Sequence, residues 1–432
     1  MAACLGLTPG CWAILFQASN PDKISPVRIR SITFFVNPAY PLEISKLELA
    51  RDFLQVSRHA FLEAGFEVQS ARLATVPFPH LLAGREHELV NLAQTLEKAA
   101  VDQGYDYVSL GPALPEQLES YLMIPDALAG ADKVFFSGLM TTSRGEVSMA
   151  AVRQCAEVIR KSSGISADGF ANLRFAALAN VSAGSAFFPA AYHHNGEPAF
   201  ALATEAADLA VKAFTQAANL NEARTDLINA METYGTKLVK VALEVEKQSG
   251  VKFSGIDYSL APFPSEELSI GTALEKMGVP ALGASGSLAA AAILADTMDQ
   301  ADIMRTGFSG LFLPVLEDAT LARRAAEGSL GVFDLLLYSA VCGTGLDTVP
   351  LPGDTTTDQL YAILLDLASL SLRLAKPLTA RLMPIPGKKA GDPTGFDFPY
   401  FANSRVMPIH ALPLQGVLKG DESFTLHRRP VS

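Results

Sequence analysis

The feature that most constrains the fold is a regular alternation of short β-branched or aromatic runs with longer helical patterns. The alternation begins at residue 27 and continues to residue 384. The expected strands lie at 27–35, 66–76, 105–110, 133–138, 173–181, 253–259, 310–315, 341–350 and 379–384. Such alternation is typical of βα units, in which most strands run parallel. The sequence therefore predicts an α/β protein built on a largely parallel sheet.

The same pattern indicates how the chain is divided. No fixed repeat or low-complexity linker interrupts its 432 residues, and α/β folds accommodate chains of this length in one unit. We expect an irregular extension at 1–26, a single α/β domain at 27–415 and a mobile tail at 416–432. A pair of helices within 205–249 is expected to stand outside the sheet and to offer a homodimer surface.

Composition excludes several classes of partner. Charged residues make up 18% of the chain and the net charge is -11, which disfavours a nucleic-acid partner. No apolar stretch approaches the length of about 20 residues needed to span a bilayer. The four cysteines, Cys4, Cys11, Cys155 and Cys342, lack CxxC spacing, which favours a reducing, cytoplasmic setting. A small-molecule ligand is the expected partner.

Candidate site residues follow the expected strands, because ligands of parallel α/β proteins gather at the carboxyl ends of strands. Asp257 and Ser259 end one strand on the same side, although Asp257 also suits a helix or turn cap. Ser285 and Gly286 open a helix whose free N–H groups suit an anion. A plain N-cap by Ser285 or Ser287 is the more common explanation of this second pair.

A third group surrounds the strand expected at 310–315. Ser309 and Gly310 precede it as candidate ligand-binding residues, and Glu317 with Asp318 follows it. The two acidic side chains are either site groups or residues stabilised by the dipole of the next helix.

A fourth group combines a thiol with two glycines. Gly343 and Gly345 leave backbone N–H groups free beside Cys342, and Asp347 follows closely. Such a loop can favour a reactive thiolate in the central cavity, and the alternative is a small buried cysteine in a tight turn. We assign candidate catalytic roles to Cys342, Asp257 and Asp347.

Two adjacent histidines complete the candidates. His193 and His194 point to opposite faces of an extended segment, so at most one can enter a given site. We take His193 as a candidate catalytic residue, with a surface or structural role as the alternative. A divalent metal ion could be held by Asp257, Glu317, Asp318 and His194, since Mg, Mn and Zn accept carboxylate and imidazole ligands.

Several common sites are missing from the sequence. It contains no HExxH, no GxSxG, no P-loop and no strand-adjacent GxGxxG motif, which argues against zincin, α/β-hydrolase, P-loop and Rossmann sites. We therefore expect no nucleotide cofactor.

Four segments, taken in order, resemble the bacterial and archaeal family known as domain of unknown function 711 (DUF711). They are residues 28–33 (RIRSIT), 255–262 (GIDYSLAP), 310–315 (GLFLPV) with Glu317 and Asp318, and 342–347 (CGTGLD) with 349–355 (VPLPGDT). The resemblance implies a fold similar to the ten-stranded α/β barrel of pyruvate formate-lyase and ribonucleotide reductase. It implies no established activity, and residues 416–432 lack a loop that could carry a glycyl radical.

Two functional hypotheses follow. The first is a cytoplasmic enzyme that acts on a small polar metabolite by non-radical acid/base or thiol chemistry. The second is a small-molecule or metal-binding protein without catalysis. An enzyme should bury at least two titratable groups within hydrogen-bond reach of a common point, which a binding protein does not require.

Overall fold

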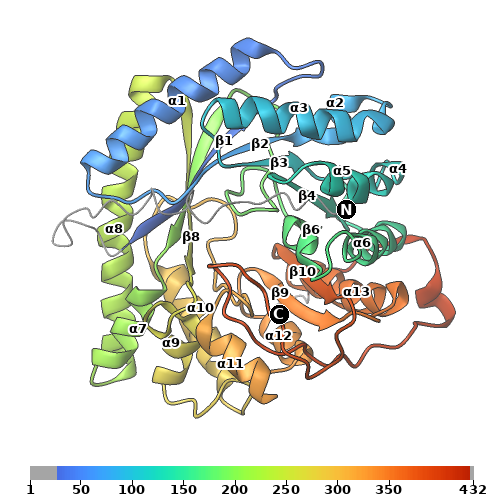
Figure 1. Cartoon of the computed structure of the whole chain (residues 1–432). Coiled ribbons are helices and arrows are strands. Elements are labelled where there is room, and N and C mark those ends of the chain that lie inside the picture. Colours follow the sequence, from blue (N-terminus) through green and yellow to red (C-terminus); the bar gives the residue numbers. More distant parts are fainter. Residues whose placement is uncertain (1–26, 429–432) are drawn as a thin grey trace, which may run out of the picture.

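A nine-stranded sheet organises the computed structural model, which describes residues 27–428 (Figure 1). The spatial order of its strands is β8-β7-β1-β2-β3-β4-β6-β10-β9. Their bounds are β1 Arg28–Val36, β2 Ala71–Pro77, β3 Tyr107–Gly111, β4 Val134–Leu139, β6 Phe175–Ala179, β7 Ala199–Glu205, β8 Lys252–Ala261, β9 Gly345–Pro352 and β10 Leu378–Ile385. The predicted α/β class is confirmed.

The sheet is mixed rather than largely parallel throughout. Strands β1, β2, β3, β4 and β6 run parallel to one another. The pair β7 and β8 runs antiparallel to β1, and the pair β9 and β10 runs antiparallel to β6. Consequently β1 and β2 begin at the same end of the sheet where β7 to β10 finish.

The expected strand at 310–315 is not part of the ladder. The segment that contains it instead makes two isolated parallel bridges, from Arg305 to Ile256 of β8 and from Pro314 to Asp347 of β9. Pro314 has no N–H to donate, which limits regular pairing. The pairing within residues 27–428 defines a large mixed sheet of nine strands, and the ten-stranded barrel stays a prediction.

Helices surround the strands and bury their apolar stripes against them (Figure 1). They are α1 Ile44–Glu63, α2 Phe78–Leu82, α3 Leu89–Asp102, α4 Glu119–Leu122, α5 Ile124–Gly130, α6 Met149–Ser162, α7 Ala207–Gln216, α8 Leu220–Ser249, α9 Ile270–Lys276, α10 Ser287–Gln300, α11 Ala319–Glu327, α12 Val332–Tyr338 and α13 Thr357–Leu374. No helix in the range 27–428 is long and apolar enough to cross a membrane.

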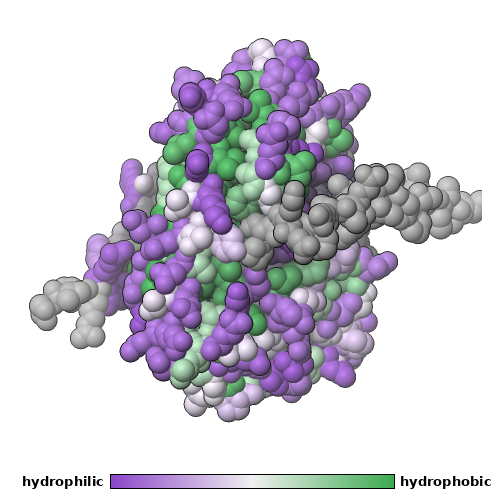
Figure 2. Space-filling view, turned by 90° about the vertical axis from the view of Figure 1, so that its left-hand side faces the viewer, coloured by the Kyte–Doolittle hydropathy of each residue, from purple (hydrophilic) through white to green (hydrophobic). Residues whose placement is uncertain are grey.

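The predicted helical pair is present as α7 and α8. Asn219 caps α8 by accepting the Glu222 N–H, and Gly250 ends it in the left-handed conformation, as its sequence signals indicate. The face of the molecule shown in Figure 2 is mostly hydrophilic with a strip of hydrophobic surface in its upper half.

Strand β7 is absent from the sequence prediction. Its sequence, AFALATE, has a single β-branched residue, Thr204, and three alanines, whereas most strands are rich in β-branched residues. The alanines have a packing role, because Ala199, Ala201 and Ala203 contact a loop that lies against the inner face of the sheet. Larger side chains at these three positions would leave no room for that loop.

We call this loop, residues 185–193 between β6 and β7, the interior loop. Its residues are buried apart from a half-buried Tyr192. Three strands hold it: Thr33 Oγ1 donates to Ala186 O at 3.3 Å, Ser109 Oγ donates to Ala191 O at 2.8 Å, and the His193 N–H donates to Thr75 O. The space expected to be a central cavity is therefore occupied by the chain itself.

Part of the segment expected to be a mobile tail packs on the body. Strand β11 (Ser423–Phe424) pairs with β5 (Val147–Ser148), and Tyr361 Oη donates to Leu418 O at 2.9 Å. The expected extension at 1–26, with Cys4 and Cys11, lies outside the described residues, as do residues 429–432.

Candidate functional site

Five charged side chains meet on the inner side of the sheet, and we call them the charged cluster. They are Arg30 of β1, Arg72 of β2, Glu317, Asp347 of β9 and Arg381 of β10. Arg381 is central: its Nη2 donates to Glu317 Oε1 at 2.7 Å and to Asp347 Oδ2 at 2.6 Å. Its Nε donates to Asp347 Oδ1, and Arg30 Nη2 donates to Glu317 Oε2.

Backbone pairing fixes where Glu317 lies. The Val315 N–H donates to Asp347 O at 3.0 Å, and the Leu316 N–H donates to Thr348 Oγ1 at 3.3 Å. This short alignment with β9 brings the next residue, Glu317, beside the side chain of Asp347. The proximity of these two acidic residues is therefore a consequence of the isolated bridge at Pro314.

The tip of the interior loop forms the floor of the cluster. The guanidinium of Arg381 lies 5.7 Å from the ring centre of Phe187, and that of Arg72 lies 5.0 Å from the ring centre of Phe188. Guanidinium groups at such distances from aromatic rings gain cation–π attraction. Two consecutive aromatic residues of the interior loop thus each contact one arginine of the cluster, Phe187 that of β10 and Phe188 that of β2.

The two carboxylates of the cluster are shifted in opposite directions. Burial disfavours ionisation of Glu317, yet Arg30 and Arg381 hold its pKa below the usual value of a glutamate. Burial raises the pKa of Asp347 despite the opposing charge of Arg381. The same two carboxylates outweigh burial at Arg381 and raise its pKa, so this arginine stays protonated.

Arg72 differs from the other two arginines because no carboxylate lies within ion-pair distance of it in residues 27–428. Its Nε donates to Ser70 Oγ at 3.0 Å, and its side chain is half-buried. Burial and the nearby charge of Arg30 lower the pKa of Arg72 to about 10. It is still a cation at neutral pH, and its charge is only partly balanced.

Aromatic residues form the rim. Tyr107 of β3 packs on Phe135 at 5.5 Å between ring centres, and Tyr400 packs on Phe263 at 5.8 Å and on Phe398 at 5.3 Å. Burial raises the pKa of Tyr107, with Arg72 opposing and Tyr400 adding a small contribution. Tyr107 and Tyr400 both keep partial exposure, so the rim is reached by solvent.

Asp257, expected at the site, has its hydrogen bonds satisfied within the fold. Its carboxylate accepts the Phe308 and Ser309 N–H groups at 3.0 Å each and the hydroxyl of Ser259. The Gly310 N–H in turn donates to Ser259 Oγ at 3.3 Å. These contacts tie β8 to the neighbouring segment, although burial still raises the pKa of Asp257.

Asp318 caps a helix, which was one of its two sequence interpretations. Its Oδ1 accepts the Thr320 and Leu321 N–H groups of α11 at 3.0 Å each and the hydroxyl of Ser269 at 2.6 Å. Asp318 therefore joins the first turns of α9 and α11 while its neighbour Glu317 enters the charged cluster.

The glycines of the fourth motif permit close packing of backbones. A Cβ on Gly343 would lie 2.3 Å from the Cα of Gly310, and a Cβ on Gly345 would lie 2.4 Å from Thr379 O. The Gly343 N–H also donates to Leu311 O at 2.8 Å. The third and fourth sequence motifs are thus in direct contact.

Cys342 is buried in the main hydrophobic cluster between sheet and helices. Its backbone carbonyl oxygen accepts a hydrogen bond from the ammonium group of Lys376. The reactivity that we predicted for this thiol stays a prediction.

The histidines lie away from the charged cluster. His193 is buried, stacks on Phe35 at 6.3 Å and contacts Gly196 O through Nε2 at 3.1 Å, while His194 is exposed. Burial lowers the pKa of His193. Phe35 is five residues along β1 from Arg30, a distance of roughly 16 Å.

The predicted metal-binding set is not assembled. Within the described range, no group of three or more His, Cys, Asp or Glu side chains is placed to hold a metal ion. Asp257 and Asp318 are used by backbone donors, and Glu317 is paired with two arginines, which corrects the sequence interpretation.

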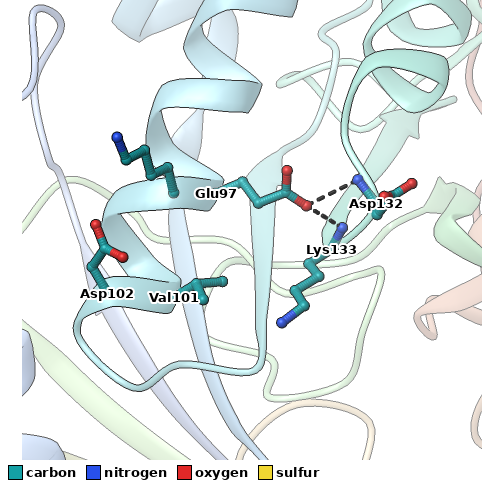
Figure 3. A pocket seen from close by; sticks show the side chains of 6 residues that line it. Glu97, Val101, Asp102, Asp132 and Lys133 are labelled. Atoms are coloured by element: carbon teal, nitrogen blue, oxygen red, sulfur yellow. Dashed lines mark hydrogen bonds between the residues drawn. The ribbon is translucent and has the colours of Figure 1, made fainter. Parts of the chain in front are cut away.

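Two further surface features lie outside the cluster. Ser285 and Gly286 are exposed at the start of α10, which packs on α8, α9 and α12. A shallow hollow of about 300 Å³ lies between α3 and the start of β4 (Figure 3). Its Glu97 carboxylate already accepts the Asp132 N–H at 2.9 Å and the Lys133 N–H.

A separate buried carboxyl predicts a pH effect. Asp208, in the first turn of α7, has an Oδ1 without a hydrogen-bond partner in the described structure, and burial raises its pKa to about 6. An unfolded aspartate titrates near about 3.9, so rising pH ionises the unfolded state first and stability declines between these values. We expect Asp208→Asn to remove this decline and to be more stable than the parent by about 1 kcal/mol above about pH 6, after allowing for partial exposure. Urea unfolding of both proteins at several pH values would test this prediction. If the free energy of unfolding changes with pH in the same way in both proteins, the prediction is contradicted.

The fold and cluster define a class: an α/β protein whose mixed sheet encloses a buried arginine–carboxylate network. Residues 23–399 match the family model described as Uncharacterised ACR (DUF711). A UPF0210 protein of Pyrobaculum aerophilum is 34% identical over 398 residues, covering 84% of this chain and 86% of that protein. A UPF0210 protein of Halothermothrix orenii is 30% identical over 368 residues, covering 81% of each chain. The chain belongs to the DUF711 family, as its motifs predicted.

Proposed function

We propose that this protein is a cytoplasmic enzyme that acts on a small polar metabolite by acid/base chemistry at the charged cluster. The observation that carries the proposal is that two buried carboxylates share one nitrogen, Arg381 Nη2, at 2.7 and 2.6 Å. This arrangement meets the criterion that an enzyme buries at least two titratable groups around a common point.

The opposite pKa shifts of the two carboxylates support separate roles. A pair of carboxyl groups whose environments separate their pKa values can divide the work of acid and base. In this proposal Glu317, whose pKa is lowered, stays ionised and acts as the base. Asp347, whose pKa is raised, retains a proton more readily and acts as the acid. Arg381 holds both.

Two structural proposals accompany this function. The segment 305–314 touches both edge strands, β8 and β9, which supports its acting as a tenth strand that closes the sheet into a barrel similar to that of pyruvate formate-lyase. The long helix α8 exposes Leu243, and we propose it as the surface of a homodimer. Size-exclusion chromatography with light scattering would test the second proposal.

Thiol chemistry and binding without catalysis are the alternatives. Cys342→Ser distinguishes thiol chemistry from acid/base chemistry, because only a catalytic thiol would make this near-isosteric change abolish turnover. A binding protein would retain a ligand from a metabolite extract and return it unchanged.

The deciding experiment is a turnover screen. Purified protein is incubated with a metabolite extract, and substrate loss and product gain are followed by mass spectrometry. We expect at least one metabolite to be converted by the parent protein and by Cys342→Ser. Glu317→Gln should lower that rate by about 100-fold or more, the usual contribution of a general base.

A matched control keeps the result specific. Glu97→Gln removes a carboxylate from the surface hollow of Figure 3 and should leave turnover unchanged. Conversion that persists in Glu317→Gln would refute the catalytic role, and a ligand recovered unchanged would favour the binding alternative.

A further inference from the structure

We propose that the charged cluster recognises a carboxylate on its ligand, and that Arg72 is the residue that binds it. This inference rests on the proposed function only in placing the ligand at the cluster. It adds the chemical class of the ligand and the group that selects it. Arg72 would be a binding residue, distinct from Glu317 and Asp347, which carry the proposed proton transfers.

Charge balance is the first argument. The cluster contains three arginines but only two carboxylates, Glu317 and Asp347, and both carboxylates contact Arg381. At the adjoining strand ends, Arg28 pairs with Glu205 at 3.2 Å and with Glu67 at 3.5 Å, and the buried Glu205 also faces Arg30. Arg72 is therefore the one arginine of the cluster that no carboxylate pairs with in residues 27–428, and a ligand carboxylate would supply that partner.

Geometry also identifies Arg72 as the arginine with free donors. Arg30 and Arg381 both pair with Glu317, whereas Arg72 uses only its Nε, toward Ser70 Oγ. Its two Nη groups make no hydrogen bond in the described part of the chain. They form the planar, two-pronged donor that matches a carboxylate.

The surroundings of Arg72 hold its guanidinium in place before a ligand arrives. Phe188 supports one face of the guanidinium at 5.0 Å, and the half-buried side chain cannot adopt the many rotamers of a surface arginine. The neighbouring positive charge of Arg30 makes an anion still more favourable here. Because Arg72 is partly buried, its attraction for an anion is also stronger than that of an arginine on the surface.

The negative charges already in the cluster favour a carboxylate ligand over a phosphate. A carboxylate carries one negative charge at neutral pH, whereas a phosphate monoester carries between one and a half and two. A dianion would leave excess negative charge beside Glu317 and Asp347. The partly exposed ring of Tyr107 offers apolar contact to the carbon skeleton of an organic acid, and inorganic phosphate has no such skeleton.

Binding of simple probes tests this inference without requiring turnover. Benzoate and pyruvate are titrated at millimolar concentration and followed by ligand-observed NMR, with benzamide as the uncharged match and inorganic phosphate as the competing anion. We expect both carboxylates to bind, benzamide and phosphate to bind more weakly, and Arg72→Met to weaken carboxylate binding by at least about tenfold.

Two further variants complete the design. Arg72→Lys keeps the charge but loses the two-pronged donor, so it should bind with intermediate affinity. Arg58→Met removes an arginine that pairs with Asp106 on the surface, and its binding should equal that of the parent. Thermal unfolding of each variant checks that the fold is retained.

The outcomes separate this inference from the proposed enzyme activity. The inference is overturned if carboxylates do not bind, if Arg72→Met binds them as well as the parent, or if phosphate binds more tightly than either carboxylate. Turnover of a neutral metabolite would refute the inference alone. Carboxylate binding that depends on Arg72, without any conversion of metabolites, would refute the enzyme activity alone.

Discussion

Replacing Arg381 with methionine is expected to destabilise the protein by about 3–5 kcal/mol, the cost of breaking a buried ion pair from one side. Arg381 makes hydrogen bonds to Asp347 and Glu317, and all three side chains are buried. Methionine fills much of the same volume but leaves Asp347 buried without its cation. Urea unfolding measures this loss. We expect the midpoint urea concentration to fall while the slope of unfolding free energy against urea concentration stays constant.

The loss of stability in Arg381→Met should be larger at neutral pH than at acidic pH. Without Arg381, burial alone acts on Asp347 and raises its folded pKa further above the unfolded value. The variant is therefore penalised most at neutral pH and recovers part of its stability as pH falls and the carboxyl takes up a proton. Arg58→Met, which breaks an exposed pair with Asp106, should cost about 1 kcal/mol or less. Equal losses in these two variants would contradict the assignment of Arg381 as the centre of the cluster.

Much of the fold could be predicted from the local sequence. The spacing of apolar residues and the positions of capping and helix-ending residues agree with the helices and strands of the structure. Helix α8 has an asparagine cap, an amphipathic pattern and a terminal glycine, and it begins and ends where these signals indicate. Strand β7 could not be found in this way. Its alanines reflect the space needed by the interior loop, and only the tertiary structure reveals that loop.

The candidate site was predicted in part. Asp347 and Glu317, both candidates from the sequence, are brought together because the segment before Glu317 aligns with β9 at Asp347. Ser285, Gly286 and the histidines do not join them, because helix α10 and the opposite end of the sheet hold these residues elsewhere. Sequence spacing alone carries no information about such distances between separate βα units.

The three arginines were missed although a signal was present. Arg30, Arg72 and Arg381 each lie within a strand whose other residues are mostly apolar or small. An arginine at such a position is rarely buried unless it is paired. Unexplained arginines in buried strands therefore predict an acidic partner or an anionic ligand, and both Glu317 and the proposed ligand carboxylate follow from that rule.

Alanine at Gly310 is expected to destabilise the protein by about 2–3 kcal/mol, because an overpacked contact must move backbone rather than a side chain. The added Cβ would lie 2.4 Å from the Cα of Gly343. Gly310 has no positive φ, so the whole effect comes from this approach of two backbones. Gly164→Ala is the matched control, since its Cβ would meet only Lys161 O at an ordinary 3.5 Å.

The same substitution tests whether the segment 305–314 closes the sheet. The Gly343 N–H donates to Leu311 O, so separating the two backbones should expose this amide to exchange with solvent. We expect hydrogen exchange at Gly343 to accelerate in Gly310→Ala and to stay unchanged in Gly164→Ala. If Gly310→Ala unfolds at the same urea concentration as Gly164→Ala and protects Gly343 equally, then Gly310 and Gly343 do not pack against each other. The ligand-binding role that the sequence suggested for both glycines would then regain its support.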